Sequence, residues 1–122
     1  MRKLKTIQTK EKLNTVVAMD EIGPGGANHL YEIYANPVDT DSRLMARIQL
    51  QCGPRKDEGS QHGVIDPDLL EIVRDRLKAF QAGPFNSEYN EEALQGVEMA
   101  LNALNKRVED RIARNVLGKN QK

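Results

Sequence analysis

Three arginines toward the end of the chain are the residues whose type and spacing are best suited to chemistry. Arg107, Arg111 and Arg114 are spaced i, i+4 and i+7, so they fall on one side of an α-helix. Guanidinium groups in a row can hold phosphate oxygens, because each presents a planar fork of N–H donors. The pattern predicts an anionic ligand. The alternative is that these arginines pair along the helix with Glu109 or Asp110.

Two further residues supply the other groups that a nucleotide site needs. An aromatic ring at Phe80 can stack a base, and the amide of Asn90 can read the edge of that base. Asn90 and Arg107 are 17 positions apart, which is about 25 Å along a helix, so one chain cannot bring them to one small ligand. If two chains pack antiparallel, Phe80 and Asn90 of one approach Arg107 and Arg111 of the other, which gives two equivalent sites under a two-fold axis.

Each of these residues also has an ordinary structural interpretation. An aromatic side chain at the end of an amphipathic helix is commonly part of the core, and Asn90 is placed where it can help a helix begin. The arginine face is equally suited to docking an acidic partner protein, in a chain whose helices serve only to assemble it. The residues alone leave the nucleotide site and the protein interface open.

Charge is balanced overall but not locally. The 122 residues have a formal net charge of zero, which argues against nonspecific binding of DNA or RNA. From Lys106 to Lys122 there are six Lys or Arg against two acids, whereas the start of the same predicted helix has Glu88, Glu91, Glu92 and Glu98. This polarity complements the helix dipole, and it also suits two helices that pair antiparallel. The two explanations are compatible.

Other candidates for chemistry are weak, and we expect no enzyme, metal site or cofactor. His29 and His62 lie in different contexts, without a nucleophile motif or the spacing of metal ligands. The glycine-rich segment 23–26 lacks the following Lys-Ser or Lys-Thr of a phosphate-binding loop, so it is best explained as a turn between strands. Arg55 follows the clearest predicted strand and lies in a loop, where binding residues are commonly displayed.

The elements that must position these residues divide into strands and then helices. Period-two alternation predicts a strand over Leu44–Cys52, with weaker strands over Leu13–Met19 and His29–Ala35, in a three- or four-stranded antiparallel meander. Asp66-Pro67 predicts a helix start, with Asp66 as the N-cap, and the helix runs to Phe80 before Gly83-Pro84.

A second, longer helix follows a tight turn. Ser87 is its predicted cap, and Gly118 its predicted end. Its apolar positions recur at three- and four-residue steps, which suits packing against another helix. They are Leu94, Val97, Leu101, Leu104, Val108 and Ile112.

The fold class predicted is therefore α+β: an N-terminal antiparallel β-meander, then a C-terminal antiparallel helical hairpin with a long second helix. We expect one domain over 1–122, with a β-region over about 1–56, a loop over 57–66 and the hairpin over 67–118. A core of this size leaves the second helix poorly supported, which favours oligomerisation. One cysteine, Cys52, and no long apolar run or signal sequence favour a soluble, unexported protein of a reducing cytosol.

At these residues the chain resembles a known family. The segment Phe80-Gln81-Ala82-Gly83-Pro84-Phe85, followed by the helix that carries Arg107, Asp110-Arg111 and Ala113-Arg114, resembles the helical hairpin that phage sponge proteins of the type one Thoeris anti-defence family share with the anti-CBASS sponge family. The preceding strands and Gly53-Pro54-Arg55-Lys56 are similar to the Thoeris anti-defence branch. The resemblance covers most of the chain.

The resemblance implies sequestration of a signal rather than catalysis. Such proteins bind glycocyclic ADP-ribose made by bacterial TIR-domain enzymes and hold it uncleaved, in the host cytoplasm, as homodimers that assemble to hexamers with sites between subunits. It makes Phe80 the stacking platform, Asn90 a polar reader, Arg107 and Arg111 the pyrophosphate clamp, and Arg55 a group that closes from its loop. A second site for cyclic oligonucleotides is also implied, with Arg114 and Lys119 as supporting residues. The chain departs from the family pattern at Asn115 and Lys119, where relatives usually have glycine and threonine.

Overall fold

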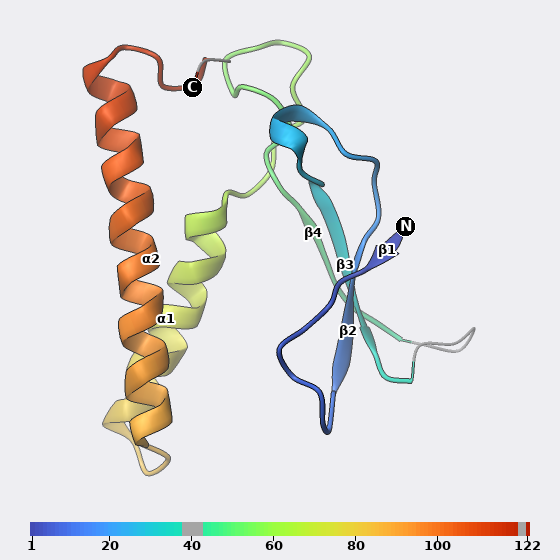
Figure 1. Ribbon diagram of the computed structural model, residues 1–122, viewed down its shortest axis with the longest axis vertical. Coiled ribbons are helices and arrows are strands. Elements are labelled where there is room, and N and C mark those ends of the chain that lie inside the picture. The colour runs from blue at the N-terminus through green and yellow to red at the C-terminus, as the bar shows by residue number, and fades with distance from the viewer. Residues whose placement is uncertain (38–42, 120–121) are drawn as a thin grey trace. The chain divides into compact units, whose positions relative to one another are not determined.

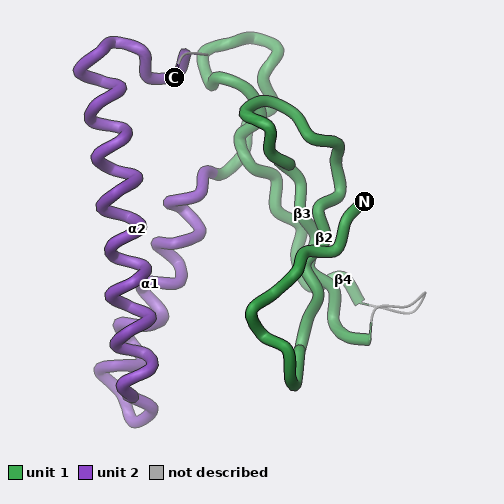
Figure 2. The backbone as a smooth tube through the Cα atoms, in the orientation of Figure 1, with its two compact units in different colours: residues 1–64 green, residues 65–122 purple. Residues whose placement is uncertain are grey.

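The chain forms two compact units in the computed structural model, which describes residues 1–37, 43–119 and 122. One unit is Met1–Val64 and the other is Ile65–Lys122, as Figure 2 shows. Figure 1 labels their elements. The first unit holds the strands and the second the two helices, so the predicted α+β class is confirmed. The expectation of a single domain stays a prediction.

The first unit is a four-stranded antiparallel sheet in the order β1-β2-β3-β4 (Figure 1). The strands are β1 (Arg2–Lys3), β2 (Asn14–Ala18), β3 (Leu30–Ala35) and β4 (Leu44–Gln49), and a short 3₁₀ turn, η1, spans Pro24–Gly26. The predicted antiparallel meander is therefore confirmed, but the sequence did not predict the strand β1. Its two residues are charged and carry no apolar alternation, and only their pairing with Val17 and Ala18 makes them a strand.

The strongest predicted strand ends earlier than its alternation suggested. β4 stops at Gln49, where the Leu50 N–H donates to the His29 carbonyl and closes the ladder with β3. Beyond that point Leu50 and Cys52 instead form isolated bridges with Val64 and Gln61. The period-two pattern continues because the chain stays extended, although its hydrogen-bonding partner changes.

The core of the first unit is small and partly polar. Val17 and Ala18 are its buried apolar residues, with relative exposures of 3% and 0%. Glu32 is also buried. Its carboxylate accepts a hydrogen bond of 2.6 Å from the Tyr34 hydroxyl and lies 3.5 Å from the Arg47 guanidinium. That hydrogen bond raises the pKa of the Tyr34 hydroxyl. The buried carboxylate is thus compensated within the sheet.

The second unit is an antiparallel pair of helices, α1 (Asp66–Ala82) and α2 (Glu88–Ala113). The Ser87 hydroxyl accepts the Asn90 backbone N–H at 3.0 Å, which confirms the predicted cap. The cap position of α1 is Ile65 rather than Asp66. The Ile65 N–H donates instead to the side chain of Asp68 at 2.9 Å, so the reciprocal half of a capping box holds this end.

The end of α2 differs from the prediction. The helix ends at Ala113 rather than near Gly118, because Asn115 adopts a left-handed conformation with φ 57°. The N–H groups of Asn115 and Val116 turn back to the carbonyls of Ile112 and Arg111, each at 2.9 Å. This is the hydrogen-bonding pattern of a Schellman-type helix end, which asparagine can adopt in place of glycine.

The hairpin does not bury its apolar residues. Of the six predicted seam positions, five are half-buried and Ile112 is 57% exposed. Arg111 is the one buried residue among the described positions of both helices. Large apolar side chains left exposed on the hairpin include Ile72, Phe85, Tyr89 and Met99. A hairpin of this kind gains little hydrophobic stabilisation alone, which supports the expectation of assembly.

Candidate functional site

Phe80 and Asn90 lie at the turn end of the helical hairpin, which is the lower end of the helices in Figure 1. Phe80 is in the last turn of α1, is 40% exposed, and has the Arg76 guanidinium 5.3 Å from its ring centroid. Asn90 is in the first turn of α2, where its side-chain amide donates to the Phe85 carbonyl at 3.1 Å. The Phe80 ring is therefore accessible for stacking, and the side-chain oxygen of Asn90 faces no donor in the described part of the chain.

The three arginines lie at the other end of α2 and occupy three different environments. Arg107 is exposed and has no hydrogen-bonding or ion-pair partner among the described residues. Arg114 pairs with Asp110 at 3.0 Å, four positions earlier on the helix. Arg111 is buried, with a relative exposure of 5%. Their shared side of the helix therefore does not give them a shared role, and Arg107 is the cation most available to an external anion.

Arg111 is packed into the second unit and is not an exposed cation. Its Nη2 group donates to the carbonyls of Val116 and Lys119, at 2.9 and 2.8 Å. The guanidinium thus fastens the turn that follows α2 onto the helix. We therefore expect the removal of Arg111 to loosen this turn, because the Lys119 carbonyl would lose the guanidinium donor, while the Val116 carbonyl would keep only the Lys119 N–H.

Arg55 and Lys119 are placed on exposed segments. Arg55 lies in the loop after β4, where its guanidinium donates to the Gly63 carbonyl at 3.1 Å. Lys119 is held through its backbone, by the Arg111 contact and by an N–H bond of 3.0 Å to the Val116 carbonyl. The two residues belong to different units, so their roles in one site stay predictions.

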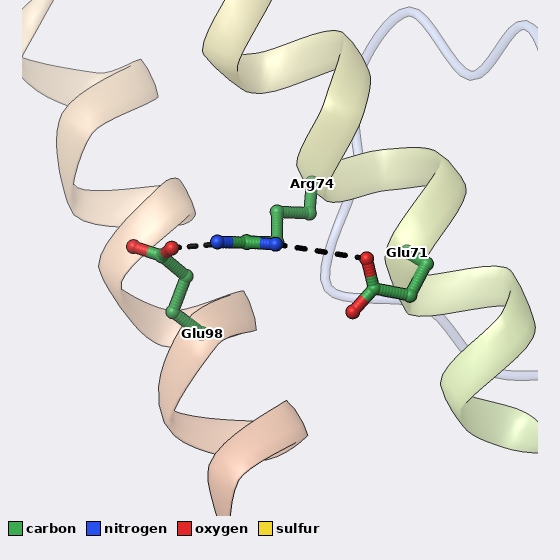
Figure 3. Close-up of polar contacts among 3 residues, drawn as sticks. All are labelled: Glu71, Arg74 and Glu98. Carbon is green, nitrogen blue, oxygen red and sulfur yellow. Dashed lines mark hydrogen bonds and ion pairs between the residues drawn. The ribbon is translucent and has the colours of Figure 1, made fainter.

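A further polar cluster, which sequence reasoning missed, lies between the two helices (Figure 3). Arg74 of α1 donates to the Glu98 carboxylate of α2 at 3.0 Å, and it lies 3.7 Å from Glu71 on its own helix. The hydrogen bond to Glu98 raises the pKa of the Arg74 guanidinium. The spacing of Glu71 and Arg74 is a recognisable i, i+3 pair, whereas the contact with Glu98 depends on how the helices pack.

This cluster borders a groove between the helices. The groove has a volume of about 620 Å³ and is lined on its apolar side by Ile65, Pro67, Leu101, Leu104 and Val108. Because two carboxylates already compensate Arg74, the cluster is a poor receiver for a phosphate. It joins the helices rather than adding a cation to the site.

Metal-binding and membrane-spanning features are not found in the described part of the chain. Within residues 1–37, 43–119 and 122, no group of three or more His, Cys, Asp or Glu side chains is placed to hold a metal ion. None of the helices built from those residues combines the length and the apolar character that crossing a bilayer requires.

Comparison with known proteins gives two matches. Residues 45–109 match the family model described as the Acb2/Tad1 hairpin domain. A protein of Bacillus phage SBSphiJ7 named Thoeris anti-defense 1 is 38% identical over 78 residues, which cover 64% of this chain. The chain spans about half the length of that relative, since the aligned region is 54% of it.

The family match contains most of the predicted site. It includes Arg55, Phe80, Asn90 and Arg107, and it ends before Arg111. The matched region runs from β4 through α1 and most of α2, and it ends two residues after Arg107. On this match, which covers more than half of the 122 residues, the chain belongs to the Acb2/Tad1 hairpin-domain family.

Proposed function

We propose that this protein sequesters a glycocyclic ADP-ribose signal, holds it uncleaved in the host cytoplasm, and thereby blocks activation of a Thoeris effector. The observation that carries the proposal is the exposed Arg107 without a partner among the described residues, on the same hairpin as the accessible Phe80 ring. Membership of the family and the name of the phage relative agree with it.

Assembly of at least two chains is part of this proposal. Phe80 in the last turn of α1 and Asn90 in the first turn of α2 lie at the turn end of the hairpin, whereas Arg107 lies about 25 Å from Asn90 along α2. A second hairpin in antiparallel orientation brings the arginine end of one chain to the aromatic end of the other. Each site then has a stacking face, an amide and cations for the pyrophosphate, and a homodimer has two such sites. Further association of dimers would give the hexamer that the family resemblance implies.

In this site the two arginines of the pyrophosphate clamp contribute unequally to ligand binding. Arg107 binds the pyrophosphate directly, while Arg111 offers the ligand only those N–H groups that its contacts with the tail leave accessible. Arg55 closes over the ligand from its loop. Arg114 and Lys119 support a second site for cyclic oligonucleotides, beside the turn that Arg111 holds. Asn115 reaches the required left-handed conformation without glycine, so this departure from the family pattern is compatible with that second site.

Titration calorimetry with a TIR-produced glycocyclic ADP-ribose tests the main proposal. We expect tight binding and, after the complex is heated, chromatographic recovery of the unaltered ligand. Recovery of an altered ligand would show an enzyme instead. An absence of binding heat would favour the alternative function, an oligomeric protein-interaction module whose arginine face docks an acidic partner.

Substitutions localise the site. Arg107→Ala should raise the dissociation constant at least about tenfold, because a hydrogen bond from a charged donor is lost. Lys106→Ala is the matched control, since it removes the same charge from the adjacent, exposed position on a different side of the helix. Phe80→Ala should also weaken binding, and its melting temperature must be compared with that of the unaltered protein. Equal affinities of Arg107→Ala and Lys106→Ala would refute the clamp.

A further inference from the structure

A cation of the same helix accompanies the Phe80 ring. The Arg76 guanidinium lies over that ring, with its central carbon 5.3 Å from the ring centroid. This separation is inside the limit of about 6 Å at which a cation and an aromatic face attract each other. The two residues are four positions apart on α1, so their side chains lie on one side of the helix. The contact is therefore formed within a single helix and needs no second element.

The surroundings of Arg76 offer its guanidinium no carboxylate. The four helix neighbours of Arg76 at steps of three and four positions are all apolar: Ile72, Val73, Ala79 and Phe80. Among the residues that the structure describes, Arg76 forms no ion pair, whereas Arg74 lies against both Glu71 and Glu98. An arginine normally finds an acidic neighbour on a helix surface in this spacing. The ring of Phe80 is thus the partner that the helix leaves to Arg76.

The orientation of the Phe80 ring is set from the preceding turn of the helix. α1 ends at Ala82, two residues after Phe80. At the steps of three and four that would bring a following side chain onto the ring, Gly83 has no side chain and Pro84 lies beyond the helix. Side chains of a helix also lean toward its N-terminus, which brings the ring back over Arg76. Arg76 is therefore placed to decide how the ring stands.

This pair has a direct consequence for a base that stacks on Phe80. Phe80 is 40% exposed, and the guanidinium lies over one face of its ring, so a flat base is left the opposite face. Guanidinium, ring and base then form a stack of three planar groups. An exposed ring that is already held in the free protein loses less rotamer freedom when the base binds. Holding the ring therefore strengthens binding without any contact between Arg76 and the ligand.

We propose that Arg76 is a positioning residue of the nucleotide site, which fixes the orientation of the Phe80 ring and leaves one defined face of it to the base. The inference rests on the proposed function, in which Phe80 is the stacking platform. It adds a cation that acts on the ligand through an aromatic ring, whereas Arg107 acts on the pyrophosphate directly.

Titration calorimetry with glycocyclic ADP-ribose tests the role of Arg76. Arg76→Ala should raise the dissociation constant about two- to fivefold, which is the worth of a cation–π contact at an exposed site. Lys78→Ala is the matched control, because it removes the same charge from an exposed position of α1 on the opposite side of the helix. Alanine favours the helix in both variants. Equal affinities of the two variants would overturn the inference.

A double-mutant cycle with Phe80→Leu shows whether Arg76 acts through the ring. Leucine keeps an apolar side chain at this position but has no aromatic face. In the Phe80→Leu background, Arg76→Ala should change the dissociation constant by less than about 1.5-fold, because the group through which it acts is already gone. A loss of the same size in both backgrounds would show that Arg76 contacts the ligand as a simple cation, and it would refute the positioning role.

Nuclear magnetic resonance of the ligand-free protein measures the contact itself. The ring current of Phe80 should shift the side-chain protons of Arg76 upfield, and Phe80→Leu should abolish this shift. Arg76 protons at the positions of an unstructured arginine in the unaltered protein would overturn the inference, whatever the ligand affinities are. This measurement also decides the matter where Phe80→Leu binds too weakly for calorimetry.

The same titrations separate this inference from the proposed function. An absence of binding by the unaltered protein would refute the proposed function, and the role of Arg76 toward the ligand with it. Tight binding by the unaltered protein that Arg76→Ala retains in full would refute the role of Arg76 and keep the proposed function.

Discussion

Replacing Arg111 with alanine should loosen the C-terminal turn and lower the stability of the helical unit. The Arg111 guanidinium is buried, and its Nη2 group donates to the carbonyls of Val116 and Lys119. A hydrogen bond from a charged donor contributes about 1.5–3 kcal/mol. Because both bonds come from one nitrogen atom, we count the pair as about 3 kcal/mol rather than doubling the larger value.

Arg107→Ala is the matched control, because Arg107 is an arginine of the same helix that is exposed and unpaired among the described residues. Urea denaturation should show a loss of about 3 kcal/mol for Arg111→Ala and a change within about 0.5 kcal/mol for Arg107→Ala. Amide exchange at Lys119, whose N–H bonds to the Val116 carbonyl, should accelerate in Arg111→Ala alone.

Both variants should lose affinity for the ligand, and only one of them should lose stability. If Arg111→Ala unfolds at the same urea concentration as the unaltered protein and keeps slow exchange at Lys119, then the guanidinium does not hold the turn. The structural role assigned to Arg111 would then be wrong, and its guanidinium would be interpreted only as a ligand-binding group, as its spacing on the helix first suggested.

Three further predictions concern the positions that hold the two units in shape. Ser87→Ala should destabilise the hairpin by about 1 kcal/mol in urea titration, since the N-cap acceptor of α2 is lost, while Ser87→Gly should cost only a few tenths. Gly63→Ala should destabilise the first unit by at least about 2 kcal/mol, measured by thermal melting, because the added Cβ would overlap the Gln49 carbonyl; a neutral result would show that this loop can move aside. Burial raises the pKa of the Asp20 carboxyl, but hydrogen bonds, first among them the one from the His29 backbone N–H, outweigh it and leave that pKa below its usual value. The ionised Asp20 carboxylate therefore stabilises the fold fully above the usual aspartate pKa range, and this stabilisation is lost as the pH falls through the lowered pKa. Asp20→Asn has no carboxylate to protonate, so its stability, measured during an acid titration, should fall less than that of the unaltered protein.

Much of the fold could be predicted because its signals are local. The alternation over Leu44–Gln49 and the Ser87 cap follow from side chains within a few positions of one another. So does the break at Gly83-Pro84. Local sterics and hydrogen bonding decide such features before any long-range contact forms. The strand β1 could not be found in this way, because two charged residues become a strand only beside β2.

The same distinction between local signals and long-range contacts applies to the candidate site. The sequence by itself determined that Arg107, Arg111 and Arg114 share one side of a helix, because the period of the α-helix is fixed. It also determined that Phe80 lies at the end of the preceding helix, because Gly83-Pro84 breaks the helix there. Only the tertiary structure decided that Arg111 is buried against the turn, Arg114 is paired with Asp110, and Arg107 is exposed. The physical reason is that the environment of a charge depends on the path of the chain beyond Ala113, where the left-handed conformation of Asn115 turns the backbone onto Arg111.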